Sequence, residues 1–153
     1  MNTYCTAHAE RLSLDYLGWD DLNTRSLDAA RERILVVNDD MRSADRLRQI
    51  LTQLGYSETL VAYSGKRAVS AVANYSPSVA IVDLQIADMT GYRLAGLLKG
   101  HALRQVRNIP LIAVAEVASP VIVALTRAAG FAAVVAKPVR PPILRAALTR
   151  SLP

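Results

Sequence analysis

The sequence has few of the residues that build disulfide frameworks, zinc sites or membrane spans. It contains one cysteine, Cys5, which cannot form an internal disulfide, and no paired Cys and His spacing predicts a zinc site. No stretch approaches the roughly 18 apolar residues of a membrane-spanning helix. Residues 1–10 also lack the charged start and apolar run of a signal peptide. We therefore expect a cytoplasmic protein without a membrane segment.

Aromatic residues are also scarce, at 5% of the chain, so a core must consist mainly of Val, Ile, Leu and Ala. Hydrophobic residues nevertheless make up 52% and charged residues 20%, which is enough apolar mass for one buried core. An aliphatic core of this kind suits a buried parallel sheet. The length of 153 residues predicts a single domain.

Acidic residues are nearly absent from the C-terminal part. From Met89 to the end the chain has nine Lys and Arg but one acid, Glu116, a net charge of +8, whereas residues 1–33 have a net charge of −2. A basic surface attracts nucleic acid, acidic proteins or anionic lipid, although it also keeps a protein soluble without any ligand. No helix-turn-helix or aromatic stacking motif accompanies it, so we do not expect direct nucleic-acid binding.

Short apolar runs alternate five times with amphipathic segments from Ile34 onward. The predicted strands cover about 34–37, 59–63, 78–82, 111–114 and 133–136. Each is followed by a segment with helical spacing of apolar residues, and the last of these spans about 143–151, delayed by three prolines. Apolar strands that alternate with helices predict an α/β fold with a doubly wound, five-stranded parallel sheet.

The first 32 residues have a different texture, which is polar, acidic and weakly periodic. We expect residues 1–32 to form an N-terminal extension, helical and interface-forming, and residues 33–153 to form the α/β domain. The extension carries apolar side chains that need a surface to cover, and its acids complement the basic C-terminal part, so we expect a homodimer. These apolar residues are Leu12, Leu14, Leu17, Trp19 and Leu22.

Charged side chains fall at the carboxyl ends of three predicted strands, where open parallel sheets form their sites. Asp39 and Asp40 follow the first strand, Asp83 follows the third, and Lys137 follows the fifth. Adjacent carboxylates share a proton or bind a cation, and hard oxygen ligands suit Mg2+. A bound Mg2+ could bring a phosphoryl group to a carboxylate, and the lysine could pair with a phosphoryl oxygen as a point charge. The pattern predicts a site for phosphorylating an aspartate.

Five short motifs lie in order between Leu35 and Pro138, mostly at successive strand ends, and the resemblance that they carry covers roughly residues 33 to 152. They are Leu35-Val36-Val37-Asn38-Asp39-Asp40, Val82-Asp83-Leu84, Asp88-Met89-Thr90-Gly91, Ala129-Gly130 and Lys137-Pro138. In this order and spacing they resemble the receiver domains of response regulators, the CheY-like superfamily. The resemblance implies a flavodoxin-like (βα)5 fold and a place in two-component signalling.

The resemblance also implies roles for individual residues. Asp83 would be the phosphoacceptor and Lys137 would contact the phosphoryl group. Mg2+ would be bound by Asp39, by Asp83 itself and by the backbone carbonyl of Gln85, and Gly91 would serve the tight turn after the acceptor. A sensor histidine kinase or a phosphotransfer protein would supply the phosphoryl group. Self-phosphorylation and self-dephosphorylation would be the only chemistry, so we expect no enzyme in the usual sense.

Four positions depart from the family pattern. Asn38 stands where the first acid of a pair is usual, so we expect it at most in the outer shell of the metal and expect weaker Mg2+ binding. Ala115 replaces a Thr or Ser whose charge-assisted hydrogen bond to the phosphoryl group is worth about 1.5–3 kcal/mol. Val134 replaces a switching aromatic residue, and Ala87 replaces a common proline. These changes predict a weak or different conformational response.

Two functions follow from this pattern. The leading hypothesis is a single-domain response regulator, because the chain ends at Pro153. It would be phosphorylated on Asp83 and signal by protein contact through its last helix–strand–helix face. The alternative is a pseudo-receiver, an interaction module that acts without phosphorylation, and Asn38, Ala115 and Val134 favour it. A hydrolase or flavin protein on a similar sheet finds little support, because no Ser nucleophile elbow is present and the acidic turn after the first strand would repel a flavin phosphate.

Overall fold

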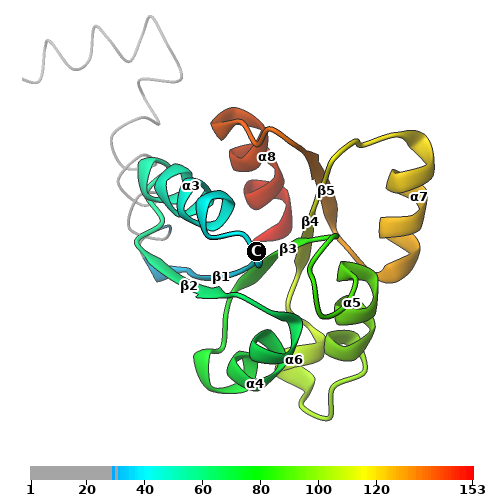
Figure 1. Cartoon of the computed structure of the whole chain (residues 1–153). Helices are drawn as coiled ribbons and strands as arrows, with labels where there is room; N and C mark the ends of the chain where they lie inside the picture. Colours follow the sequence, from blue (N-terminus) through cyan, green and yellow to red (C-terminus); the bar gives the residue numbers. More distant parts are fainter. Residues whose placement is uncertain (1–28, 30) are drawn as a thin grey trace, which may run out of the picture.

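The computed structural model describes Ala29 and residues 31–153, and its centre is a five-stranded parallel sheet (Figure 1). Our expectation of a helical, interface-forming extension falls mostly on residues 1–28, which lie outside the described residues. The strands lie side by side in the order β2-β1-β3-β4-β5, and every neighbouring pair is parallel. Their bounds are β1 (Arg33–Val37), β2 (Glu58–Ala62), β3 (Val79–Asp83), β4 (Leu111–Ala115) and β5 (Ala133–Ala136).

Helices cover both faces of this sheet, as the alternation of strands and helices predicted. One face is covered by α3 (Met41–Gln53) and α8 (Pro141–Ser151). The other face is covered by α4 (Gly65–Tyr75), α5 (Gly91–Lys99), the short α6 (Arg104–Arg107) and α7 (Pro120–Ala129). No helix in the described part of the chain is long and apolar enough to cross a membrane.

Alternate residues of each strand enter two separate cores. In β1, Ile34 and Val36 pack with α3 and α8, whereas Leu35 and Val37 pack with α4 and α5. Successive side chains of a strand point to opposite faces, so a strand covered on both sides must be apolar at every position. The short, uninterrupted apolar runs of the sequence follow from this double burial.

Four of the helices that follow the loops at the carboxyl edge begin at a residue whose side-chain oxygen caps the first turn. Asp40, Ser64, Thr90 and Ser119 cap α3, α4, α5 and α7, and each accepts a hydrogen bond from the backbone N–H three residues later. Capping of this kind satisfies an N–H that has no partner within the helix. The loops between strand and cap are therefore short or tightly held, and the strand-end side chains stay at the edge of the sheet.

The structure corrects the sequence analysis at two places. We expected three prolines to delay the last helix to about residue 143, but Pro141 and Pro142 occupy its first two positions. A proline ring fits the first turn of a helix, where its missing N–H removes no hydrogen bond. The sequence analysis also missed α6, because four residues are too few to show a helical period.

Candidate functional site

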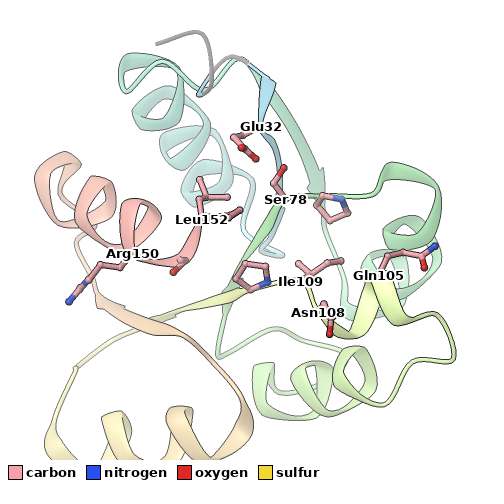
Figure 2. A pocket seen from close by; sticks show the side chains of 11 residues that line it. Glu32, Ser78, Gln105, Asn108, Ile109, Arg150 and Leu152 are labelled. Atoms are coloured by element: carbon pink, nitrogen blue, oxygen red, sulfur yellow. The ribbon is translucent and has the colours of Figure 1, made fainter. Parts of the chain in front are cut away.

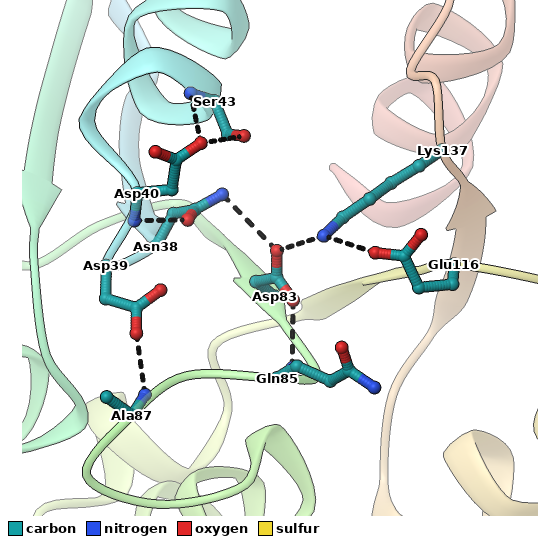
Figure 3. A network of polar contacts seen from close by, with 9 residues as sticks. All are labelled: Asn38, Asp39, Asp40, Ser43, Asp83, Gln85, Ala87, Glu116 and Lys137. Carbon is teal, nitrogen blue, oxygen red and sulfur yellow. Dashed lines mark hydrogen bonds and ion pairs between the residues drawn. The ribbon is translucent and has the colours of Figure 1, made fainter.

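Asp83 lies at the centre of the carboxyl edge, because β3 runs between β1 and β4. Only 4% of the residue is exposed to solvent. Its carboxylate has donors on both oxygens: Oδ2 lies 2.8 Å from Nζ of Lys137, and Oδ1 accepts a 2.8 Å hydrogen bond from the backbone N–H of Gln85 (Figure 3). A buried charge is stable only when it is paired and hydrogen-bonded, and these contacts meet that requirement.

Lys137 bridges two carboxylates. Its Nζ lies 2.8 Å from Oδ2 of Asp83 and 3.2 Å from Oε1 of Glu116. The sheet holds this arrangement, since Ala115 pairs with Ala136 and the N–H of Lys137 donates to the carbonyl of Ala115 at 2.8 Å. Burial lowers the pKa of Lys137, but hydrogen bonds and charges from Asp83 and Glu116 outweigh it and raise the pKa above the usual value. The lysine is therefore an ammonium ion at neutral pH.

Asn38 links the end of β1 to Asp83. Its side chain is buried, and its Nδ2 donates to Oδ2 of Asp83 at 3.4 Å. Its Oδ1 accepts a 2.9 Å hydrogen bond from the N–H of Asp40, which shapes the turn after β1. Asp40 itself points away from the site, because its Oδ2 accepts hydrogen bonds from Ser43 at the start of α3. Asn38 thus shapes the turn after β1 and also contacts Asp83.

Two carboxylates hold the loop that follows Asp83. Asp39 accepts a 2.7 Å hydrogen bond from the N–H of Ala87 through Oδ2. Asp88 accepts hydrogen bonds of 2.9 and 3.0 Å from the N–H groups of Gly65 and Lys66, the first residues of α4. These backbone donors lower the pKa of Asp88. The loop is thus tied to the turn after β1 and to the start of α4.

Gly91 packs closely against the backbone of Asp83 and Leu84, which leaves no room for a side chain. A Cβ atom on Gly91 would lie 2.8 Å from Cα of Leu84 and 2.9 Å from the carbonyl oxygen of Asp83. The N–H of Gly91 also donates to the carbonyl of Leu84 at 2.9 Å, which closes the turn. Any larger residue would push the start of α5 away from the end of β3.

The residues at this edge fit Mg2+ chemically. Among residues 29 and 31–153, no group of three or more His, Cys, Asp or Glu side chains gathers closely enough to hold a metal ion. Asp39 and Asp83 nevertheless provide hard oxygen donors, and Mg2+ uses only one or two carboxylates while keeping several waters. Oδ1 of Asp39 accepts no hydrogen bond from the described part of the chain, which leaves a ligand atom available.

The expected departures from the family pattern are visible as apolar contacts. Ala115 is buried at the end of β4 and Val134 is partly buried, and both pack in the core on the face covered by α4, α5, α6 and α7. Neither can donate a hydrogen bond to a group on Asp83. Ala87 has a different effect, since its N–H is the donor to Asp39 and a proline there would have none.

Sequence reasoning found the three strand-end residues Asp39, Asp83 and Lys137, and the structure brings Asp83 and Lys137 into contact. It missed Glu116 and the loop contact of Asp88. Glu116 carried one signal, because it directly follows the fourth apolar run and is the single acid after Met89. The contact of Asp88 depends on backbone N–H groups of a distant helix, which no sequence pattern marks.

A pocket of about 590 Å³ opens at the opposite edge of the sheet (Figure 2). It is lined by residues that precede β3 and β4 and by the end of α8, including Ser78, Asn108, Arg150 and Leu152. Oγ of Ser151 is buried here without a hydrogen-bond partner in the described residues. None of the expected site residues lines this pocket, so the candidate site is the polar network of Figure 3.

Comparison with known proteins agrees with this geometry. The profile of the response regulator receiver domain matches residues 34–149. The DNA-binding response regulator MtrA of Mycolicibacterium smegmatis is 30% identical over 115 residues, which are 75% of this chain and 48% of that protein. The transcriptional regulatory protein KdpE of Mycobacterium tuberculosis is 37% identical over 67 residues, which are 44% of this chain and 29% of that protein. The chain thus spans at most about half the length of these curated relatives.

Solved structures show the same fold. The chemotaxis protein CheY4 of Vibrio cholerae superposes with a TM-score of 0.72 at 24% identity, covering 79% of this chain and 98% of that one. A CheY-like receiver domain protein of Methanospirillum hungatei has a TM-score of 0.65 at 31% identity, covering 77% and 90%. With the family profile matched over most of its length, the chain belongs to the response regulator receiver domain family, a signalling domain of two-component systems.

Proposed function

We propose that this domain accepts a phosphoryl group on Asp83 and passes the signal on by contact with another protein. The observation that carries the proposal is the 2.8 Å ion pair between Lys137 and the buried carboxylate of Asp83. An ammonium ion already in contact with the acceptor oxygen is placed to neutralise phosphoryl oxygens as they arrive.

Receiver domains act with histidine kinases or phosphotransfer proteins, and we propose such a donor here. A carboxylate oxygen of Asp83 attacks the phosphorus of a phosphohistidine. A new P–O bond forms while the P–N bond breaks, and the imidazole leaves and takes up a proton. Lys137 balances the charge on the phosphoryl oxygens from the β5 side, and the N–H of Gln85 holds the other carboxylate oxygen in place.

Receiver domains generally bind Mg2+ at the acidic phosphorylation site, and we propose Mg2+ as the cofactor here. Asp39, Asp83 and the backbone carbonyl of Gln85 would hold the ion, with the amide of Asn38 in its outer shell. When bound, the ion would supply the remaining positive charge for the phosphoryl oxygens. Because Asn38 is neutral, we expect weaker binding than a pair of acids would give.

The output surface in this proposal is the face formed by α7, β5 and α8. It carries exposed apolar side chains, with Val121 65% exposed, Leu125 50% exposed and Ile143 54% exposed. Large apolar side chains on one face are typical of surfaces that bind other proteins. The curated relatives are DNA-binding regulators, but this chain spans half their length or less, so the expectation that it does not itself bind nucleic acid stays a prediction.

Intact mass spectrometry tests the proposal. We expect the wild-type chain, incubated with acetyl phosphate and Mg2+, to gain one phosphoryl group, and Asp83→Asn to gain none. Asp45→Asn is the matched control, because it also converts a carboxylate to an amide but lies exposed on α3 and makes none of the contacts of the network in Figure 3. An unmodified wild-type chain under conditions that phosphorylate a known receiver would rule the proposal out.

The second candidate function is a pseudo-receiver that binds its partner without phosphorylation. The buried Ala115 favours it, because no hydroxyl group reaches the acceptor from β4. In that case Asp83→Asn would leave partner binding unchanged, and the mass experiment would show no gain for any variant. The expected homodimer and cytoplasmic location also stay predictions.

A further inference from the structure

Glu116 lies directly beside Lys137, the lysine that contacts Asp83. It follows the last residue of β4, and Lys137 follows the last residue of β5, so the two residues continue the pairing of Ala115 with Ala136 by one step. The N–H of Lys137 donates to the carbonyl of Ala115 at 2.8 Å, which holds the two strand ends together at this point. Oε1 of Glu116 lies 3.2 Å from Nζ of Lys137, as Figure 3 shows.

The lysine is therefore shared between two anions with different surroundings. The side chain of Asp83 is 5% exposed, whereas that of Glu116 is 62% exposed and can move into solvent. A phosphoryl group would add a charge of about −1.5 to −2 at the Asp83 end of this bridge. The carboxylate of Glu116 would then repel the phosphoryl group and also compete with it for the ammonium ion.

We propose that Glu116 is a positioning residue that competes with the phosphoryl group for Lys137 and thereby lowers the fraction of Asp83 that is phosphorylated. The proposal rests on the proposed function of Asp83. The competing carboxylate would make the phosphorylated state of Asp83 harder to maintain. It lies at the end of β4, where Ala115 already provides no hydroxyl donor. Two neighbouring residues at the end of β4 thus both weaken the hold on a phosphoryl group: Ala115 lacks a hydroxyl donor, and Glu116 adds a negative charge.

Glu116 forms no covalent bond in either the uptake or the loss of the phosphoryl group. In uptake from acetyl phosphate, an oxygen of Asp83 attacks phosphorus, the P–O bond to the acetyl group breaks, and acetate leaves with the electron pair. In loss, water attacks phosphorus, the P–O bond to Asp83 breaks with its electron pair left on the carboxylate, and the oxygen and both protons of the water leave in the released H2PO4−. Glu116 acts only through its charge and its contact with Lys137, so its removal should shift the balance without abolishing the reaction.

The test measures the phosphorylated fraction by intact mass at increasing acetyl phosphate concentration and constant Mg2+. We expect Glu116→Gln to lower the half-saturating concentration roughly two- to tenfold, the size expected for one partly exposed charge. Glu116→Asp keeps the charge and should stay close to wild type, and Asp45→Asn controls for the loss of one negative charge elsewhere. Because Glu116 is exposed, the advantage of Glu116→Gln should shrink as salt is added.

A second measurement tests the contact without phosphorylation. We expect Glu116→Gln to lower the pKa of the Lys137 ammonium group, measured by NMR titration of the unphosphorylated chain, because Glu116 contributes to its rise. If neither wild type nor Glu116→Gln is phosphorylated, the proposed function of Asp83 fails, and the role of Glu116 fails with it. If wild type is phosphorylated and Glu116→Gln behaves like Asp45→Asn, only the role of Glu116 is overturned.

Discussion

At the scale of single residues, Asp83 shows how the fold keeps a charge that is almost fully withdrawn from water. Lys137, the N–H of Gln85 and the amide of Asn38 all donate to its two oxygens. Removing one partner of such a pair leaves the other without compensation, which costs more than the pair contributes. The same contacts that would serve phosphorylation therefore also stabilise the folded chain.

Lys137→Met should destabilise the chain by about 1–3 kcal/mol, because it leaves the carboxylate of Asp83 buried without its ammonium partner. Urea unfolding measures the effect. Lys66→Met is the matched control, since Lys66 is exposed on α4 and its side chain makes no ion pair within the described residues. The double variant Asp83→Asn with Lys137→Met should recover part of the loss. Equal stability of the two single lysine variants would contradict the prediction.

The same pair predicts how this contribution depends on pH. The pKa of Lys137 is raised in the folded chain from its usual value of 10.5, so its stabilisation is complete below that pH and is lost as the pH rises through the raised pKa. The difference in unfolding free energy between wild type and Lys137→Met should be constant near neutral pH and shrink in strong alkali. Buried tyrosines also titrate there, but they are common to both chains and cancel.

At the proposed Mg2+ site, Ala87→Pro should weaken binding of the ion roughly tenfold, because hydrogen bonds that orient a metal ligand are worth about 10- to 100-fold in affinity. The N–H of Ala87 is the donor that holds Asp39, and proline removes it. Ala87→Gly keeps the N–H and serves as the control. Titration calorimetry with Mg2+ measures both variants, and equal affinities would show that this hydrogen bond does not orient Asp39.

The residues that the sequence revealed share one property, which is their place at strand ends. Asp39, Asp83 and Lys137 could be predicted because parallel strands bring their carboxyl ends to one edge. The donor from Ala87 and the contact of Glu116 with Lys137 could not, because they depend on loop conformation and on which side chain turns inward. Sequence reasoning found the charged residues that gather at this edge, and it missed the groups that contact them.

At the scale of elements, the strands were predictable and their limits were not. The expected strands agree with the observed ones to within one residue at each end, because double burial makes each a short apolar run. Helix limits depend instead on capping and on the first-turn geometry of proline. For this reason α8 begins at Pro141, about two residues earlier than expected.

Two glycines of α5 should respond in opposite ways to alanine. Gly91→Ala should destabilise the chain by about 1–3 kcal/mol, because the added Cβ would meet the backbone of Asp83 and Leu84 at less than 3.0 Å. Gly96→Ala should stabilise the chain by about 0.5–1 kcal/mol. Beyond its own helix backbone and chain neighbours, no atom would lie within 4 Å of the added Cβ, and alanine favours a helix. Thermal or urea unfolding measures both, and effects of the same sign would refute the packing argument.

At the scale of the whole molecule, charge is distributed unevenly along the chain. The part from Met89 onward has a net charge of +8, and the first 33 residues have a net charge of −2. An acidic segment with apolar residues complements a basic domain whose α7 exposes Val121 and Leu125 along one side. Opposite charges on two parts of one chain favour contacts within it or between two copies.

This complementarity predicts that the full chain is a dimer and that a chain beginning at Arg31 is a monomer. Light scattering measures the mass of each, and circular dichroism verifies that the shorter chain is folded. Added salt should weaken the dimer of the full chain, because contacts between exposed charges are screened. Unchanged dimerisation of the shorter chain would remove the N-terminal segment from the interface.

The strand order also determines when the acceptor centre first exists. Asp83 ends the third strand, but its ammonium partner arrives with the fifth, after β4 has been inserted between them. During synthesis on the ribosome, the nascent chain carries Asp83 without its lysine until β5 and Lys137 have emerged. Under the proposed function, premature transfer from a kinase should be disfavoured at that stage, so competence to receive a signal would belong to the finished sheet.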